Sequence, residues 1–206
     1  DQRAFDQLRP MEIIPNINKF AEGSCPIRCG NTHVLCCASV EDKTPPHVPE
    51  GEGWVTAEYS MLPRANRERS RRDISKLKLS PRSAEIQRLV GRALRAAVDH
   101  KKLGERTITI DCDVLQGDGG TRTASITGAY VALADAIAWA KEQKIISAKA
   151  NPLIDSVSAI SVGIIDGTPM LDLPYTADVR AETDLNVVVT GSGKFVEVQG
   201  TAAGAP

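Results

Sequence analysis

The sequence Gly119-Gly120-Thr121-Arg122 combines the residue types of an anion-binding turn. A period-two apolar pattern precedes it and a helical apolar pattern follows it, so the glycines fall where a helix begins. The first amides of a helix have no partner within the helix, and the helix dipole favours an anion beside them. The Arg122 guanidinium can add two parallel donors to phosphate oxygens. The turn therefore predicts a phosphate site, with a strand-turn-helix joint that binds nothing as the alternative. It lacks the Gly-Lys-Ser/Thr ending of a nucleotide-binding P-loop, which disfavours a nucleoside triphosphatase.

A second arginine, Arg82, occupies an unusual place for a cation. Ser80-Pro81 is typical of a helix N-cap followed by proline in the first turn, which puts Arg82 at the positive end of the helix dipole. Two interpretations remain open: an anion lies nearby, or Arg82 is a surface arginine tolerated at slight cost.

Two aspartates, Asp178 and Asp184, form a candidate metal site. Paired carboxylates suit a hard cation such as Mg²⁺ or Mn²⁺. Along a straight strand, six residues at about 3.3 Å each would separate them by roughly 20 Å, so the chain must fold back if they are to act together. Alternatively, they serve only the local turn.

Positive charge is concentrated in residues 64–82, which carry a net charge of +6, whereas the whole chain carries −1. The charged members are Arg64, Arg67, Glu68, Arg69, Arg71, Arg72, Asp73, Lys76, Lys78 and Arg82. Such a segment is typical of contact with nucleic-acid phosphates, or of a solvated surface. It contains no aromatic residue, so if it binds nucleic acid we expect contacts with the backbone and no base stacking.

The elements that would position these residues follow from the apolar periodicity. The pattern predicts strands over 107–114, 156–165 and 185–190, and helices from Pro81 and after Gly120. Gly30-Asn31 and Asp166-Gly167 predict two hairpin turns. Alternating strands and helices predict an α/β fold.

Composition narrows the function class. With 206 residues and 42% hydrophobic content, the chain can build one substantial core or two lobes. No apolar run reaches the roughly 20 residues needed to cross a membrane, and the polar start lacks a signal-peptide core, so we expect a cytoplasmic protein without membrane contact. The five cysteines contain no Cys-x-x-Cys pair; we expect buried thiols, with zinc or redox chemistry as the alternative.

Several longer strings resemble the bacterial ribonuclease PH family across nearly the whole chain. These strings are Gly53–Arg64, Glu85–Leu89, Thr109–Val114, Gly119–Ser125 and Glu182–Asn186. The resemblance implies a phosphate-dependent 3′-5′ exoribonuclease that trims tRNA precursors by passing the terminal nucleotide to inorganic phosphate. It also implies one domain over 1–206 with a two-lobed α/β (α+β) fold, in which mixed sheets pack against helices and duplicated halves span roughly 1–104 and 105–206. The implied assembly is a homohexameric ring of dimers.

The resemblance also implies residue roles. Arg82, Gly120, Thr121 and Arg122 match the family's phosphate-binding positions, and Asp178 and Asp184 match its acidic pair around a metal. We therefore expect Asp178, Asp184 and Arg122 to be catalytic and Mg²⁺ to be the cofactor.

Arg64, Arg69 and Arg72 match the positions implicated in holding tRNA. The resemblance also implies a final helix, which is not part of residues 1–206. A non-catalytic RNA-binding ring subunit and a phosphate-binding enzyme with a small-molecule substrate are the alternatives.

Overall fold

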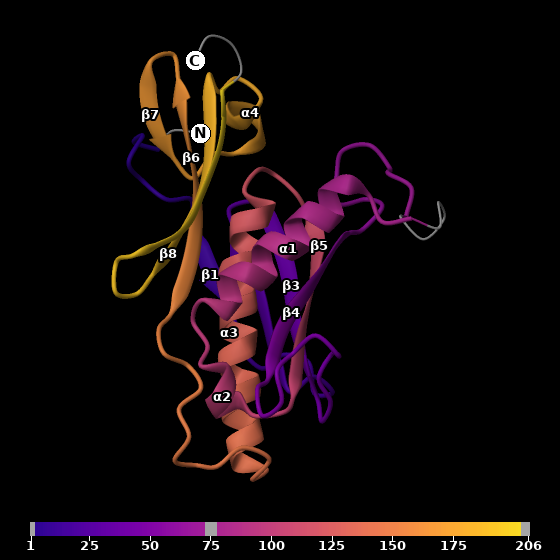
Figure 1. The fold of residues 1–206 in the computed structure, drawn as a ribbon. Helices are drawn as coiled ribbons and strands as arrows, with labels where there is room; N and C mark the ends of the chain where they lie inside the picture. Colours follow the sequence, from indigo (N-terminus) through magenta and orange to yellow (C-terminus); the bar gives the residue numbers. More distant parts are fainter. Residues whose placement is uncertain (1–2, 73–77, 203–206) are drawn as a thin grey trace.

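Two β-sheets and the long helix between them organise the chain. The computed structural model describes residues 3–72 and 78–202 (Figure 1). The first lobe contains β1 (Met11–Ile13), β2 (Gly23–Cys29), β3 (Thr32–Glu41), β4 (Trp54–Met61), α1 (Pro81–Arg95), α2 (His100–Leu103) and β5 (Thr107–Gln116). After α3 (Thr121–Glu142), the second lobe contains β6 (Val157–Ile165), β7 (Thr168–Leu171), α4 (Tyr175–Asp178), β8 (Thr183–Thr190) and β9 (Phe195–Ala202).

The two sheets differ in strand direction. The first sheet has the order β1-β2-β3-β5-β4 and is mixed, because β4 pairs with β5 in parallel while its other pairs are antiparallel. Parallel neighbours need a crossover connection, and α1 lies in that connection. The second sheet, with the order β7-β6-β8-β9, is antiparallel throughout.

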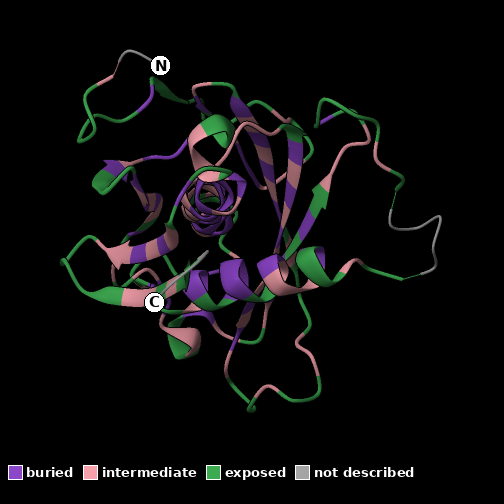
Figure 2. Ribbon diagram, turned by 90° about the horizontal axis from the view of Figure 1, so that it is seen from above, coloured by how far each residue is buried: buried purple, intermediate pink, exposed green. Residues whose placement is uncertain are grey.

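Helix α3 lies between the two sheets and contacts both. It packs against β2 and β3 of the first sheet and against β6 and β8 of the second. Figure 2 shows the helix end-on near the centre, with buried residues on all sides of its axis. Alanine recurs on these faces at positions 124, 129, 132, 136 and 140, which lets both sheets approach closely. The beginning of α3 is therefore held by both lobes.

Local signals placed the main elements correctly. Ser80 caps α1, accepting a hydrogen bond from the amide of Ser83 at 3.0 Å, and Pro81 is the first helical residue. Gly30 has φ +55° in the first hairpin, and Asp166 and Gly167 have φ +49° and +74° in the second. The predicted fold class is confirmed; the predicted relationship between residues 1–104 and 105–206 remains a prediction.

All five cysteines are free thiols, and four of them are buried. Burial raises the pKa of Cys25 and of Cys29 to about 11 in each case, so both thiols stay protonated at neutral pH. Cys36 and Cys112 face each other on β3 and β5 with their sulfurs 3.9 Å apart. Separately, none of the described helices is long and apolar enough to cross a membrane.

Candidate active site

A cavity of about 360 Å³ lies where the beginning of α3 meets the second lobe; we call it the main cavity. Its described lining residues are Met61, Asn66, Arg82, Gly117, Gly119, Gly120, Thr121, Arg122, Ser161, Tyr175, Asp178, Asp184 and Asn186. All the residues expected from the sequence to bind phosphate or metal line this one cavity. They come from five separate elements or turns of the chain.

The first turn of α3 offers donors to this cavity. Gly120 is the N-cap with φ +69°, no side chain among the described residues caps the helix, and the first turn has no acidic residue. The amide of Ala124 donates to the Gly120 carbonyl at 3.0 Å, so the preceding amides lie ahead of the helical ladder. The Tyr59 hydroxyl donates to Thr121 Oγ1 at 3.0 Å and fixes that side chain. This end of α3 therefore presents backbone amide donors to which an anion can bind.

Gly119 brings the second lobe against the turn. Its φ is +79°, and a Cβ atom built there would lie 2.3 Å from the carbonyl oxygen of Leu173. The Tyr175 amide donates to the Asp118 carbonyl at 3.2 Å beside it. Because α4 ends at Asp178, this close approach also sets how near the acidic residue lies to the anion site.

We expect Gly119→Ala to lower the free energy of unfolding by about 3 kcal/mol, because left-handed strain and a backbone clash add together. Gly193→Ala is the matched control, since Gly193 has the same φ of +79° with nothing within 4 Å of its added Cβ. It should cost only about 1 kcal/mol. Urea unfolding of both variants measures the difference, and equal losses would contradict the clash.

Arg122 reaches the cavity from α3, and Arg82 reaches it from the first turn of α1. The Arg122 side chain is largely buried and donates from Nη2 to Glu85 Oε2 at 2.9 Å. Gln199 of β9 donates to the other Glu85 oxygen at 3.1 Å, so Glu85 is held from the second lobe as well. Two guanidinium groups from different helices therefore converge on one space, as an oxyanion with several oxygens requires.

Asp178 ends α4 and Asp184 lies in β8, and the chain folds back between them as the acidic-pair hypothesis required. Burial, and then the nearby Asp178 carboxylate, raise the pKa of Asp184, and Arg122 and Arg82 partly oppose this shift. Such a pair of carboxylates fits a divalent cation, which would relieve their repulsion. Among the described residues, no third acidic, histidine or cysteine side chain completes a group of metal ligands there.

An arginine and an aspartate that the sequence reasoning missed hold the backbone of the glycine turn in place. Arg9 donates from Nη2 to Asp172 Oδ1 at 2.6 Å and from Nε to Oδ2 at 3.0 Å. Its Nη1 donates to the Asp118 carbonyl at 2.7 Å. Both side chains are almost fully buried. This pair joins the segment before β1, the glycine turn and the loop that leads into α4.

We expect Arg9→Ala to lower the free energy of unfolding by about 3 kcal/mol, because it removes the hydrogen-bonded partner of the buried Asp172 carboxylate and leaves only the Arg3 guanidinium, 4.0 Å away. Arg28→Ala is the control: Arg28 pairs with Glu12, but both side chains are more than half exposed, so the loss should stay below about 1 kcal/mol. Equal losses in urea unfolding would contradict the assigned role of Arg9.

Burial alone would raise the pKa of Asp172, but hydrogen bonds from Arg9 outweigh it, and the pKa lies below its ordinary value. A lowered pKa contributes stability above the unfolded-state pKa, and that contribution is lost as the pH falls through the folded-state pKa. The Arg9–Asp172 contribution should thus be complete at neutral pH and weaken below about pH 4.

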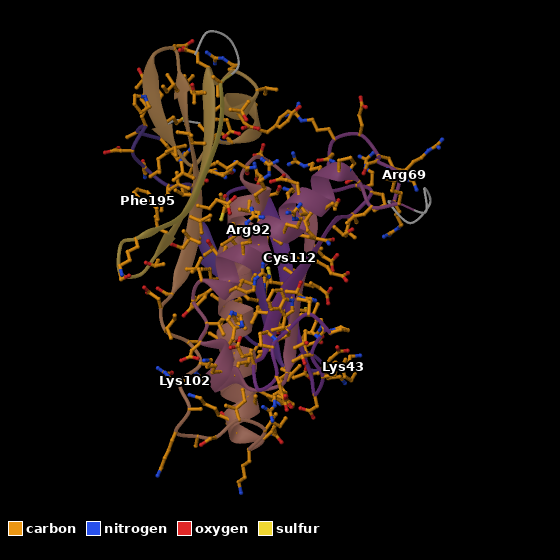
Figure 3. The ribbon with its side chains drawn as sticks, viewed as in Figure 1. Lys43, Arg69, Arg92, Lys102, Cys112 and Phe195 are labelled. Carbon is orange, nitrogen blue, oxygen red and sulfur yellow. The ribbon has the colours of Figure 1, made fainter. Side chains whose placement is uncertain are left out.

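The arginines matched to tRNA contacts lie outside the main cavity. Arg64, Arg69 and Arg72 are exposed on the segment that follows β4. Figure 3 shows Arg69 on the part of this segment that projects away from the two sheets, far from Phe195 on β9. Arg72 lies near Asp113 of β5. Burial raises the pKa of Asp113, and the positive charge of Arg72 partly opposes that rise. Lys76 and Asp73 of the basic segment fall outside the described residues.

Other lining residues also escaped the sequence reasoning. Ser161 and Asn186 pair in register across β6 and β8, and Asn186 lies two positions beyond Asp184. Because side chains alternate along a strand, the period-two rule places Asn186 on the same face as Asp184. Asn66 and Tyr175 had no comparable signal, since both lie outside the periodic patterns.

Comparison with known proteins gives one consistent family. The sequence matches "3' exoribonuclease family, domain 1" over residues 7–138 and "3' exoribonuclease family, domain 2" over residues 155–205. It is 56% identical over 202 residues to a ribonuclease PH of Methylobacterium radiotolerans, covering 98% of this chain and 84% of that protein.

Solved structures agree on the fold. The rice (Oryza sativa) Rrp46 structure is similar with a TM-score of 0.80 at 17% identity, covering 99% of this chain and 85% of the other. An Archaeoglobus fulgidus exosome with RNA bound to the active site is similar with a TM-score of 0.79 at 22% identity, covering 99% and 82%. At these identities, the structural likeness concerns the fold alone.

Proposed function

The chain belongs to the 3′ exoribonuclease family, and from this premise we propose that it is a phosphate-dependent 3′-5′ exoribonuclease acting at the main cavity. One observation carries the proposal: arginines from α1 and α3 and carboxylates from α4 and β8 line the same space. Phosphate and an RNA 3′ end are both anions, and the reaction must bring them together. A cavity with cationic and acidic sides suits that task.

In the proposed reaction an oxygen of inorganic phosphate attacks the phosphorus of the last phosphodiester. The new P–O bond forms as the bond to the 3′ oxygen of the preceding nucleotide breaks. A nucleoside diphosphate is released, and the 3′ oxygen of the shortened RNA takes up a proton. No side-chain nucleophile is needed, so the protein contributes binding, alignment and charge stabilisation.

The residues divide this work between them. Arg82, Arg122 and the amides around Gly120 and Thr121 hold the phosphate in line with the scissile bond. Asp178 and Asp184 are the residues that would hold Mg²⁺. When bound, that cation would offset charge on phosphate oxygens.

Incubation with a short tailed RNA, with and without phosphate, tests the proposal. Phosphate should be required, and the product should be a nucleoside diphosphate. Release of nucleoside monophosphates without phosphate would indicate hydrolysis instead. RNA binding without any release would support the non-catalytic ring subunit.

We further propose tRNA precursors as the substrates, a homohexameric ring as the assembly and the cytoplasm as the location. The ring is supported by apolar side chains exposed on the edge strand β9, where Phe195 is 73% and Val198 is 54% exposed. A molar-mass measurement in solution tests the hexamer, and a monomeric mass would overturn it.

Arg64 and Arg69 should bind RNA mainly through its phosphates. For single strands, a plot of the logarithm of the binding constant against the logarithm of the salt concentration falls with a slope of about 0.7 per neutralised phosphate. The double variant Arg64→Ala, Arg69→Ala should therefore reduce the steepness of this slope by about 1.4. Arg28→Ala removes an exposed arginine from β2, outside the basic segment, and should leave the slope unchanged. An unaltered slope in the double variant would remove both arginines from the RNA path.

A further inference from the structure

Two further cavities share lining residues with the main cavity, and Asn66 lines all three. The Tyr175 cavity, of about 370 Å³, is lined by Asn66, Arg67, Glu68, Gly117, Asp118 and Tyr175. The Arg71 cavity, of about 210 Å³, shares Met61, Asn66 and Arg82 with the main cavity and adds Arg71. The reacting centre is therefore approached from two directions.

The two approaches differ in charge. The described lining of the Arg71 cavity contains Arg71 and Arg82 and no carboxylate, which suits an anion. The Tyr175 cavity sets Arg67 against the carboxylates of Glu68 and Asp118, so its charge does not favour a phosphate. Carboxylates and an asparagine side chain accept hydrogen bonds from the amino groups of nucleobases. This second direction suits a base.

Tyr175 is the only aromatic side chain among the described residues that line the main cavity and the Tyr175 cavity. It is 49% exposed although its backbone is fixed. The Tyr175 amide donates to the Asp118 carbonyl, and the adjoining backbone is in close contact with Gly119. A ring that extends from a fixed backbone and lines both cavities offers a face on which a base can stack.

We propose that the Tyr175 cavity is a nucleobase subsite, in which the base of a nucleotide flanking the scissile bond stacks on the Tyr175 ring. This inference rests on the proposed exoribonuclease function and adds to it a contact with the base. The basic segment, residues 64–82, contains no aromatic residue, so Tyr175 supplies the aromatic ring that this segment lacks. Because every base presents a π-face, stacking there holds RNA ends of any sequence.

Steady-state kinetics test the subsite. Tyr175→Ala should raise the KM for RNA about tenfold, while Tyr175→Phe, which keeps the ring, should stay near the wild-type value. The KM for phosphate should not change in either variant. Phe20→Ala is the matched control, since Phe20 is 83% exposed and does not line these cavities. An unchanged KM for RNA in Tyr175→Ala, or an equal rise in both Tyr175 variants, would overturn the proposal.

A binding measurement without phosphate gives an answer that does not depend on turnover. Two RNAs carry the fluorescent base 2-aminopurine, one at the last position and one at the penultimate position, and one of the two should lose fluorescence when it binds the protein. Tyr175→Leu keeps an apolar side chain but no aromatic ring, so this variant should abolish the loss. Quenching that persists in Tyr175→Leu would reject stacking. Phosphate-dependent nucleoside diphosphate release by the wild-type protein tests the reaction separately.

Discussion

Replacing Arg122 with alanine should reduce kcat/KM for phosphate by about 10²–10³-fold. The guanidinium lines the main cavity beside the first turn of α3, which no side chain among the described residues caps, so it is placed to hold charge that develops on the phosphate oxygens. RNA binding without phosphate should change little. Rates of nucleoside diphosphate release across a range of phosphate concentrations measure the effect.

Arg122→Lys and Arg92→Ala are the controls for this prediction. Lysine keeps the positive charge but lacks the planar fork, so Arg122→Lys should recover only part of the activity. Arg92 makes a two-point ion pair with Glu197 on the same side of α1 as Glu85, but it does not line the main cavity. Unchanged phosphate dependence in Arg122→Ala would reject the role proposed for Arg122.

Asp184→Asn should reduce turnover at least about a hundredfold while leaving RNA affinity largely intact, because it removes a carboxylate and keeps the shape. Its stability should not fall. Burial and the neighbouring Asp178 raise the pKa of Asp184, so the charged form is disfavoured in the folded protein and neutralising it relieves that cost.

Three measurements on the same sample check this prediction: nucleoside diphosphate release, RNA binding and thermal unfolding. Asp166→Asn is the control, because Asp166 is an exposed aspartate in the β6–β7 turn, paired with Arg180. It should retain full activity. Full activity in Asp184→Asn would remove Asp184 from the mechanism.

Short-range signals in the sequence account for most of the fold. Ser80-Pro81 and Asp166-Gly167 act through their own backbones, so their helix start and hairpin turn could be predicted without knowledge of the rest of the molecule. The glycine turn before Arg122 was predicted for the same reason.

The support of the site could not be predicted in this way. Arg9 and Asp172 are 163 positions apart, and Glu85 and Gln199 are 114 positions apart, so neither pair leaves a local pattern. The position of Asn66 on the wall of all three cavities likewise left no local pattern in the sequence. Asn186 is an exception, because its spacing from Asp184 already places both residues on one strand face.

The Arg9–Asp172 pair also orders events during synthesis. Asp172 lies 163 positions after Arg9, so Arg9 is synthesised long before the partner that holds it against the glycine turn. The loop that would bind phosphate thus gains its buried support only after the second lobe has been synthesised. A nascent chain that already exposes its basic segment could bind cellular RNA before its catalytic site is fully formed.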